Sequence, residues 1–332
     1  MVRCSTPPLR LLALSLGASS AWSEELIDRS LLATERVENQ ALGTVDYVRR
    51  RAPSKKAAKN PNKQPSVVVL RIAPSESPSL ILQLGTASPE LAVRAALHVA
   101  RDVAGIDVNM GCPKKFSLAG GMGAALLRDG GKACEIVRAL RGEEGLRGKG
   151  VSAKIRLVGE DGDGEEKLLA QTQAFMVALY SAGASSICLH PRTASDSSHV
   201  PSARARWASL RPLFDCVPIP VLLNGDCYTR ADIQSIPALL PSCAGVLLAR
   251  PALLDPSIFA PAPLPPAELM RRYLRLCRRY DNHFVNTKYV ACELMNMRRH
   301  PPALGLRPPD FPGGQTVAKV CGTREMDGLC EL

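Results

Sequence analysis

A cysteine and two lysines follow a short apolar run about one third of the way along the chain. Residues 107–115 read DVNMGCPKK, so an amide, a thiol and two ammonium groups stand within seven residues, at Asn109, Cys112, Lys114 and Lys115. Gly111 permits a tight turn before the thiol, and Pro113 stiffens the chain after it. Such a thiol is either a reactive group or a small buried side chain, and these residues alone leave both readings open.

Polar groups also end the other apolar runs of the sequence. The runs are short and are separated by segments long enough for helices, which predicts parallel strands at 19–24, 80–85, 105–111, 151–157, 185–192, 221–226 and 245–250. The polar side chains at their ends are Gln83, Asn109, Cys112, Lys154, Arg156, His190, Arg192, Asn224, Asp226 and Arg250. Taken singly, each of these has an ordinary structural explanation, but their shared position at successive strand ends favours a site.

Seven strands and a fragment of one more at Met1 predict an α/β fold. We expect a (β/α)8 TIM-type barrel with a truncated first strand over residues 1–258, and a small helical domain over 259–332. An open doubly wound sheet is the alternative. In a barrel the carboxyl ends of the strands surround one mouth, where catalytic groups lie.

The charge of the chain is concentrated in two segments. The chain has 332 residues and a net charge of +11. Residues 49–63 contain seven basic and no acidic residues, and residues 261–332 contain eleven basic and seven acidic ones, so the remainder is balanced. This pattern favours a partner that carries phosphates, although a solvated loop or a nuclear-localisation patch also fits residues 49–63.

The eleven cysteines do not form a recognisable framework. Their number is odd, their spacing is irregular and no two form a C-x-x-C pair, so we expect neither a metal site nor disulfides. The first 22 residues resemble a secretory signal, but their apolar positions also have helical spacing. We expect a helix over 9–17, no membrane span, and a cytoplasmic monomer, with nucleus or organelle left open.

The predicted ring of polar groups suits a flavin mononucleotide. It combines three cations with three amides, namely Lys154, Arg156 and Arg250 with Gln83, Asn109 and Asn224. Amides pair with the edge of the flavin ring, a lysine stabilises its reduced anionic form, and backbone N–H groups near Gly225 and Arg250 bind a phosphate.

Several motifs resemble those of the tRNA-dihydrouridine synthases, most closely the eukaryotic branch that modifies a single D-loop uridine. The most specific is AGIDVNMGCPKKFSLAGGMGAALL at 104–127. Others follow in the expected order: EELID (24–28), LQLGT (82–86), KIR (154–156), LHPR (189–192), LLNGD (222–226), LLAR (247–250) and YDNHFVNTKY (280–289). The resemblance implies an FMN-dependent barrel, driven by NADPH, that acts on tRNA.

The resemblance also implies a role for each matching residue. Cys112 is expected to protonate uracil C5 while reduced FMN delivers hydride to C6 from the opposite face. The expected cofactor contacts are Met1, Val2, Gln83, Asn109, Lys154, His190, Asn224, Gly225, Asp226, Ala249 and Arg250. Lys114, Lys115, Arg156 and Arg192 are expected to face the substrate.

A proline-rich linker at 251–266 precedes an expected amphipathic helix over 266–280. One face carries Leu269, Tyr273, Leu276 and Tyr280, and the other carries Arg271, Arg275, Arg278 and Arg279. With Lys288, these arginines are predicted to contact the tRNA backbone, although such stripes often mark only solvent exposure.

Three features depart from the family pattern. The match begins at Met1 within the usual first strand, residues 49–66 form a basic insertion, and LHPR replaces H-G-R. The chain is expected to lack the double-stranded RNA-binding domain of animal relatives. Two other functions stay open at this stage: a flavin reductase of free pyrimidines, and a non-catalytic tRNA-binding protein.

Overall fold

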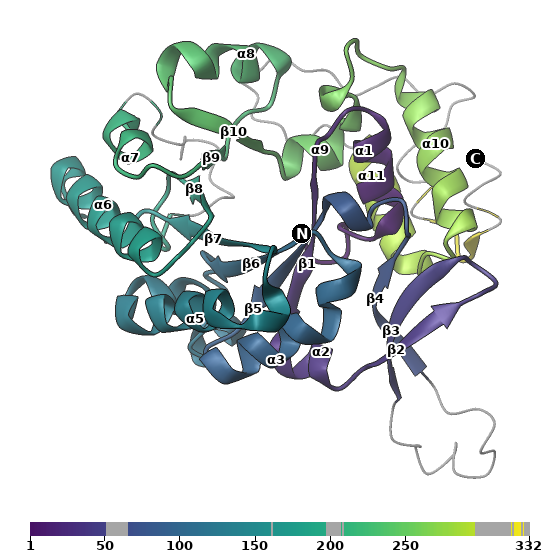
Figure 1. The fold of residues 1–332 in the computed structure, drawn as a ribbon. Coiled ribbons are helices and arrows are strands. Elements are labelled where there is room, and N and C mark those ends of the chain that lie inside the picture. Colours follow the sequence, from purple (N-terminus) through teal and green to yellow (C-terminus); the bar gives the residue numbers. More distant parts are fainter. Residues whose placement is uncertain are drawn as a thin grey trace.

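The computed structural model describes residues 1–50, 66–160, 162–196, 207, 209–295, 320, 322–326 and 328. Its centre is a curled, fully parallel sheet of seven strands (Figure 1). In spatial order the strands are β1 (Ala21–Ile27), β5 (Leu80–Gly85), β6 (Gly105–Met110), β7 (Gly150–Arg156), β8 (Ser186–His190), β9 (Val221–Asn224) and β10 (Cys243–Leu247). The order follows the chain, as in a barrel, and within the described residues β1 and β10 do not pair.

Helices cover the outer face of this sheet (Figure 1). The longer ones are α3 (Pro89–Val99), α5 (Gly130–Gly142), α6 (Glu165–Ser181) and α8 (Arg230–Leu239). Short helices between the strands are α2 (Asp28–Leu32), α4 (Lys115–Ala119), α7 (Arg211–Asp215), and the 3-10 turns η3 (Ser77–Ser79), η4 (Ala100–Asp102), η5 (Gly123–Leu127) and η6 (Glu144–Leu146). After the last strand come α9 (Arg250–Leu254) and the 3-10 turn η7 (Pro256–Phe259). Side-chain caps start several of them; Thr229 and Asp232 form a capping box on α8.

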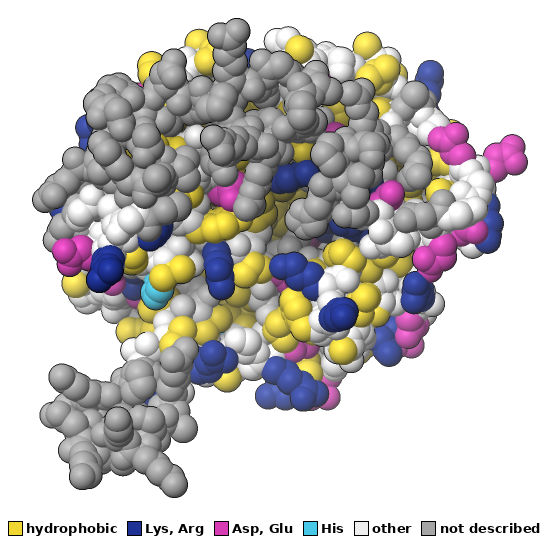
Figure 2. Space-filling model, turned by 180° about the vertical axis from the view of Figure 1, so that it is seen from behind, with side chains coloured by type: hydrophobic (Ala, Val, Ile, Leu, Met, Phe, Trp, Pro, Cys, Tyr) yellow, Lys and Arg dark blue, Asp and Glu magenta, His cyan; other side chains and the backbone are white. Residues whose placement is uncertain are grey.

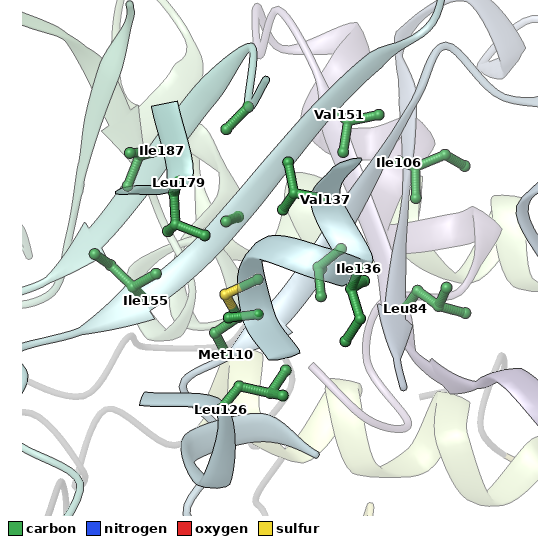
Figure 3. Packing of buried hydrophobic residues seen from close by; sticks show 14 of the residues in the cluster. Leu84, Ile106, Met110, Leu126, Ile136, Val137, Val151, Ile155, Leu179 and Ile187 are labelled. Atoms are coloured by element: carbon green, nitrogen blue, oxygen red, sulfur yellow. The ribbon is translucent and has the colours of Figure 1, made fainter. Parts of the chain in front are cut away.

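The main core lies between the sheet and these helices. Leu84, Ile106, Val151 and Ile187 point outward from their strands against Ile136 and Leu179 of the covering helices (Figure 3). Near-continuous apolar strands are buried on both faces in such an arrangement, which explains why they were recognisable in the sequence.

A second, three-stranded antiparallel sheet was not predicted. It consists of β2 (Glu35–Asn39), β3 (Thr44–Arg50) and β4 (Ser66–Ile72), in that order. The basic insertion joins β3 to β4, since Arg50 pairs with Ser66; residues 51–65 lie outside the described residues.

The C-terminal helices form a smaller core with α1 (Pro7–Ser15). These helices are α10 (Pro266–Arg279) and α11 (Phe284–Met295), and Figure 1 shows all three together. Leu9 and Leu12 of α1 pack in one cluster with Tyr273, Cys277 and Val290. The first helix therefore packs on the C-terminal helices.

The predicted α/β class with its outer helices is confirmed. All seven predicted strands are present, with ends shifted by a few residues. Residues 1–4, where a strand fragment was expected, form a turn. Within the described ranges no helix combines the length and apolar character that crossing a bilayer requires.

Candidate active site at the carboxyl ends of the strands

The strand register places polar residues side by side on the inner face of the sheet. Glu25 is the neighbour of Gln83, and Gln83 is the neighbour of Asp107. One step further along the strands, Asn109 lies beside Lys154. Residues paired in this way on parallel strands point to the same face. The inner face is therefore polar toward its carboxyl end, whereas the outer face is apolar.

A chain of hydrogen bonds runs from this face to the cysteine turn. Gln83 donates from Nε2 to Asp107 Oδ2 at 2.8 Å, and Asn109 donates from Nδ2 to Gln83 Oε1 at 3.1 Å. The Asn109 Oδ1 atom accepts from the backbone N–H groups of Gly111 and Cys112, at 3.0 and 2.9 Å. Asn109 therefore holds the turn that presents the thiol.

Asp107 anchors the other end of this chain. It is fully buried and also accepts a hydrogen bond from Ser152 Oγ at 2.6 Å. Burial raises the pKa of Asp107, against the opposing effect of its hydrogen bonds with Ser152 and Gln83. An Asp two residues before Asn109 on one strand shares its face, so the alternation in DVNM is a signal by which the sequence could have revealed it.

The Cys112 thiol is half-buried at the mouth of the sheet. Burial raises its pKa, and the charge and hydrogen bonding of Glu25 raise it further, while backbone hydrogen bonding at Lys114 lowers it. Lys114 and Lys115 are exposed where the chain enters α4. The thiol is thus held in its protonated form.

Four cations surround the buried imidazole of His190. Burial lowers the pKa of His190, and the charges of Lys154, Arg156, Arg192 and Arg250 lower it further. The imidazole is therefore neutral. Burial also lowers the pKa of Lys154, whose charge is partly balanced by Asp107. A neutral imidazole among several cations is an environment that favours an anionic ligand.

Asp226 joins two of these cations. It forms ion pairs with Arg192 and with Arg250, the latter at 3.1 Å. Asp226 has a φ of +56° directly after Gly225 at +117°, so the chain turns sharply there. Asn224 donates from Nδ2 to Leu247 O at 2.6 Å and links β9 to β10 just before Ala249. The residues predicted to lie on the phosphate side of the cofactor therefore lie close together, where β9 and β10 end.

Arg156 forms hydrogen bonds with the backbone of the site. It is buried, and it donates hydrogen bonds to the carbonyl oxygens of Gly111 and Thr193, each at 2.8 Å. The structure thus gives Arg156 a role in holding the cysteine turn.

Of the two predicted cofactor contacts at the N-terminus, the Met1 α-amino group is buried near Lys154, whereas the Val2 side chain is exposed. Burial lowers the pKa of the Met1 α-amino group, on which Glu24, Glu25 and Lys154 also act. The exposed fraction of Val2 is 52%.

The predicted RNA-contacting residues of the C-terminal region divide into two groups. Arg271, Arg275, Arg278 and Arg279 are all on α10, and all four side chains are exposed. Lys288 is half-buried: its ammonium donates to Thr323 O at 2.9 Å and lies 5.7 Å from the centre of the Phe284 ring. On the face seen in Figure 2, Lys and Arg side chains are spread among apolar and acidic ones.

The family model for dihydrouridine synthase (Dus) matches residues 19–301. The chain belongs to the dihydrouridine synthase family. No group of residues that could hold a metal ion is present in the part of this family member that the structure describes.

Two fungal proteins named tRNA-dihydrouridine(20) synthase, NAD(P)+, match most of the chain. The Schizosaccharomyces pombe protein is 36% identical over 300 residues, which cover 89% of this chain and 58% of that protein. The Saccharomyces cerevisiae protein is 34% identical over 305 residues, which cover 89% of this chain and 75% of that protein. The chain thus spans little more than half of the first relative.

Among solved structures, a FabK mutant from Thermotoga maritima superposes with a TM-score of 0.41. The sequences are 12% identical, and the match covers 78% of this chain and 61% of that one.

Proposed function

We propose that this member of the family is a tRNA-dihydrouridine synthase that uses FMN and NADPH to reduce the C5=C6 bond of a D-loop uridine. The observation that carries the proposal is the placement of the half-buried Cys112 thiol at the strand ends, on a turn that Asn109 and Arg156 hold by hydrogen bonds. Both fungal relatives carry position 20 in their names, which supports that nucleotide as the target.

The residues present fit FMN. The cations around His190 favour an anionic cofactor, and the buried amides of Gln83 and Asn109 suit the edge of a flavin ring. Lys154 and His190 would lie at the ring, and the phosphate would lie toward Asn224, Gly225, Asp226, Ala249 and Arg250. When bound, FMN supplies the hydride for uracil C6, after reduction by NADPH.

Cys112 would supply the proton. Its thiol is held protonated by burial and by Glu25, which suits a group that must keep its proton until an acceptor develops charge. The side-chain Oδ1 atom of Asn109 fixes the backbone that leads to the sulfur, so the donor is oriented before the substrate arrives.

The substrate would be a tRNA whose target base leaves its stack to enter the mouth of the sheet. Lys114 and Lys115 are exposed beside Cys112, and the α10 arginines offer a second set of phosphate contacts. In this proposal residues 1–258 perform the reduction, and residues 259–332 form the tRNA-binding part of a cytoplasmic monomer.

The test is the formation of dihydrouridine in tRNA by the purified protein with NADPH and FMN, mapped to single nucleotides. We expect product at one D-loop uridine, and we expect Cys112→Ala to keep bound FMN but form no product. Turnover of free uracil or orotate without turnover of tRNA would instead assign the chain to the reductases of free pyrimidines. Bound tRNA with no flavin absorbance under any reconstitution would make it a non-catalytic tRNA-binding protein.

A further inference from the structure

The hydrogen bonds between Asp107 and the cysteine turn all have a fixed direction. The turn begins with two backbone N–H groups, those of Gly111 and Cys112, which can only donate, and both bind Asn109 Oδ1. The Nδ2 atom at the other end of the Asn109 amide can also only donate, and it binds Gln83 Oε1. The Gln83 amide is then left with its Nε2 atom facing Asp107. Each amide therefore has one orientation that matches both of its neighbours.

A chain of hydrogen bonds with this direction must end at an acceptor, and Asp107 provides one. An amide has a donor at one end and an acceptor at the other, whereas a carboxyl has oxygen at both ends. Asp107 Oδ2 accepts from Gln83 Nε2 at 2.8 Å, and Asp107 Oδ1 accepts from Ser152 Oγ at 2.6 Å. The Asp107 side chain is thus held from the strands on either side, β5 and β7.

Solvent has little access to these side chains. Asp107 is 0% exposed, and Gln83 and Asn109 are 8% and 9% exposed. A buried amide nitrogen that loses its acceptor costs more free energy than the hydrogen bond itself contributes. Removing the Asp107 carboxyl would therefore drive Gln83 toward another acceptor, and Asn109 would lose its partner in turn.

We propose that Asp107 is a positioning residue for Cys112, and that it acts through the amides of Gln83 and Asn109. The inference rests on the proposed function, in which the Cys112 thiol must face the uracil ring. The Asp107 carboxyl ends the chain with an acceptor, and the two amides then keep a single orientation. Asn109 Oδ1 therefore stays on the backbone that leads to the sulfur. Because Asp107 is fully buried, it acts on the thiol through this chain and not by contact with the substrate.

The test measures the cysteine turn itself rather than turnover. Hydrogen exchange of the Gly111 and Cys112 N–H groups is followed by NMR in the full chain with FMN in excess. Asp107→Val keeps a strand-forming side chain but has no acceptor, so both groups should exchange about tenfold faster, the factor that the loss of one hydrogen bond gives. Ser152→Ala is the control, because it removes the other hydrogen bond of Asp107 and leaves the chain to Cys112 intact. It should exchange at the wild-type rate.

Two further variants test whether Asp107 acts through the amides. Gln83→Met has a similar unbranched shape and cuts the chain at its middle, so it should speed exchange by a similar factor even if Asp107→Val does not fold. Asn109→Ala removes the last link, and adding Asp107→Val to it should cause no further increase. Wild-type exchange in Asp107→Val or Gln83→Met, or a full effect of Asp107→Val in the Asn109→Ala background, overturns the role of Asp107. Each of these failures is distinct from product formation by Cys112→Ala, which would overturn the proposed function.

Discussion

Arg156 at the end of β7 donates a hydrogen bond from Nε to the carbonyl oxygen of Gly111, 2.8 Å away on the neighbouring strand's turn. Its Nη1 atom donates to Thr193 O at the same distance, so one guanidinium joins the segments that follow β6 and β8. The packing is close, since a Cβ on Gly111 would lie 3.3 Å from Arg156 Cγ. The backbone before Cys112 is thus held from two sides, by Asn109 and by Arg156.

Replacing Arg156 should slow proton transfer. In Arg156→Met the Gly111 carbonyl loses its partner, and a displacement of the sulfur by about 1 Å costs on the order of 100-fold in rate. Single-turnover formation of dihydrouridine with pre-reduced flavin measures this step. Arg128→Met is the matched control, because Arg128 is exposed and its ion pair with Glu160 lies on the surface. A rate equal to that of the control would contradict the role of Arg156.

Replacing Lys154 should weaken flavin binding. Lys154→Met removes a cation from the site, and the loss of one charged hydrogen bond corresponds to roughly 10- to 100-fold weaker binding. Titration of FMN followed by flavin fluorescence measures the affinity. Lys149→Met is the control just before the opposite end of the same strand, where the ammonium donates to Val103 O at 2.6 Å. Equal affinities in the two variants would exclude Lys154 as a flavin contact.

The arginines of α10 should determine the salt dependence of tRNA binding. Changing Arg271, Arg275, Arg278 and Arg279 to Gln should weaken binding at low salt. The slope of log K against log salt should fall by roughly 0.7–0.9 for each phosphate that these side chains no longer neutralise. The matched control changes four exposed arginines elsewhere, at Arg94, Arg128, Arg138 and Arg147. A slope that falls equally in both variants would mean that α10 is not a specific tRNA-binding element.

The parallel sheet was predictable because its strands are continuous apolar runs that are buried on both faces. Strand β5 lies at the predicted residues, and β9 ends two residues before the predicted end. The small antiparallel sheet was missed because β2, with the sequence ERVEN, is largely exposed and has no apolar face to recognise. For α1, the helical spacing revealed an apolar face but not its partner, which is α10.

The sequence predicted those site residues that lie at the ends of apolar strands. Asn109, Cys112, Lys154 and His190 were identified in this way. Glu25 and Asp107 lie within strands, where an acidic residue looks like a surface position. Their places in the site depend on the pairing register of the strands, although the alternation in DVNM already puts Asp107 on the same face as Asn109.

Asp46 should make the stability of the small sheet depend on pH. Burial raises the pKa of Asp46, but hydrogen bonds from Arg71 and Asn39 outweigh this, so the net pKa lies below its usual value of 3.8. The stabilisation is therefore complete above about pH 4 and is lost as the pH falls through the lowered value. Asp46→Asn should cost about 3 kcal/mol near pH 6, because it removes the carboxylate that pairs at 2.7 Å with the largely buried guanidinium of Arg71.

Urea unfolding at pH 6 and pH 3 tests this prediction. The difference in midpoint between wild type and Asp46→Asn should narrow at pH 3, because this pH lies below the usual carboxyl pKa of 3.8 and the stabilisation by Asp46 falls as the pH drops toward its lowered pKa. Glu38→Gln is the control, since Glu38 is an exposed carboxylate on the same sheet. A difference that stays constant between the two pH values would contradict the assigned linkage.

Arg71 also fixes the position of α10 relative to the small sheet. Besides pairing with Asp46, it donates from Nη1 to the carbonyl oxygens of Tyr280 and Asp281, where α10 ends. The helix is thus tied to the three-stranded sheet of β2, β3 and β4. If α10 binds tRNA phosphates, the distance from those phosphates to the Cys112 sulfur is constant. A constant distance would select the target nucleotide by its position along the RNA, independent of the bases that surround it.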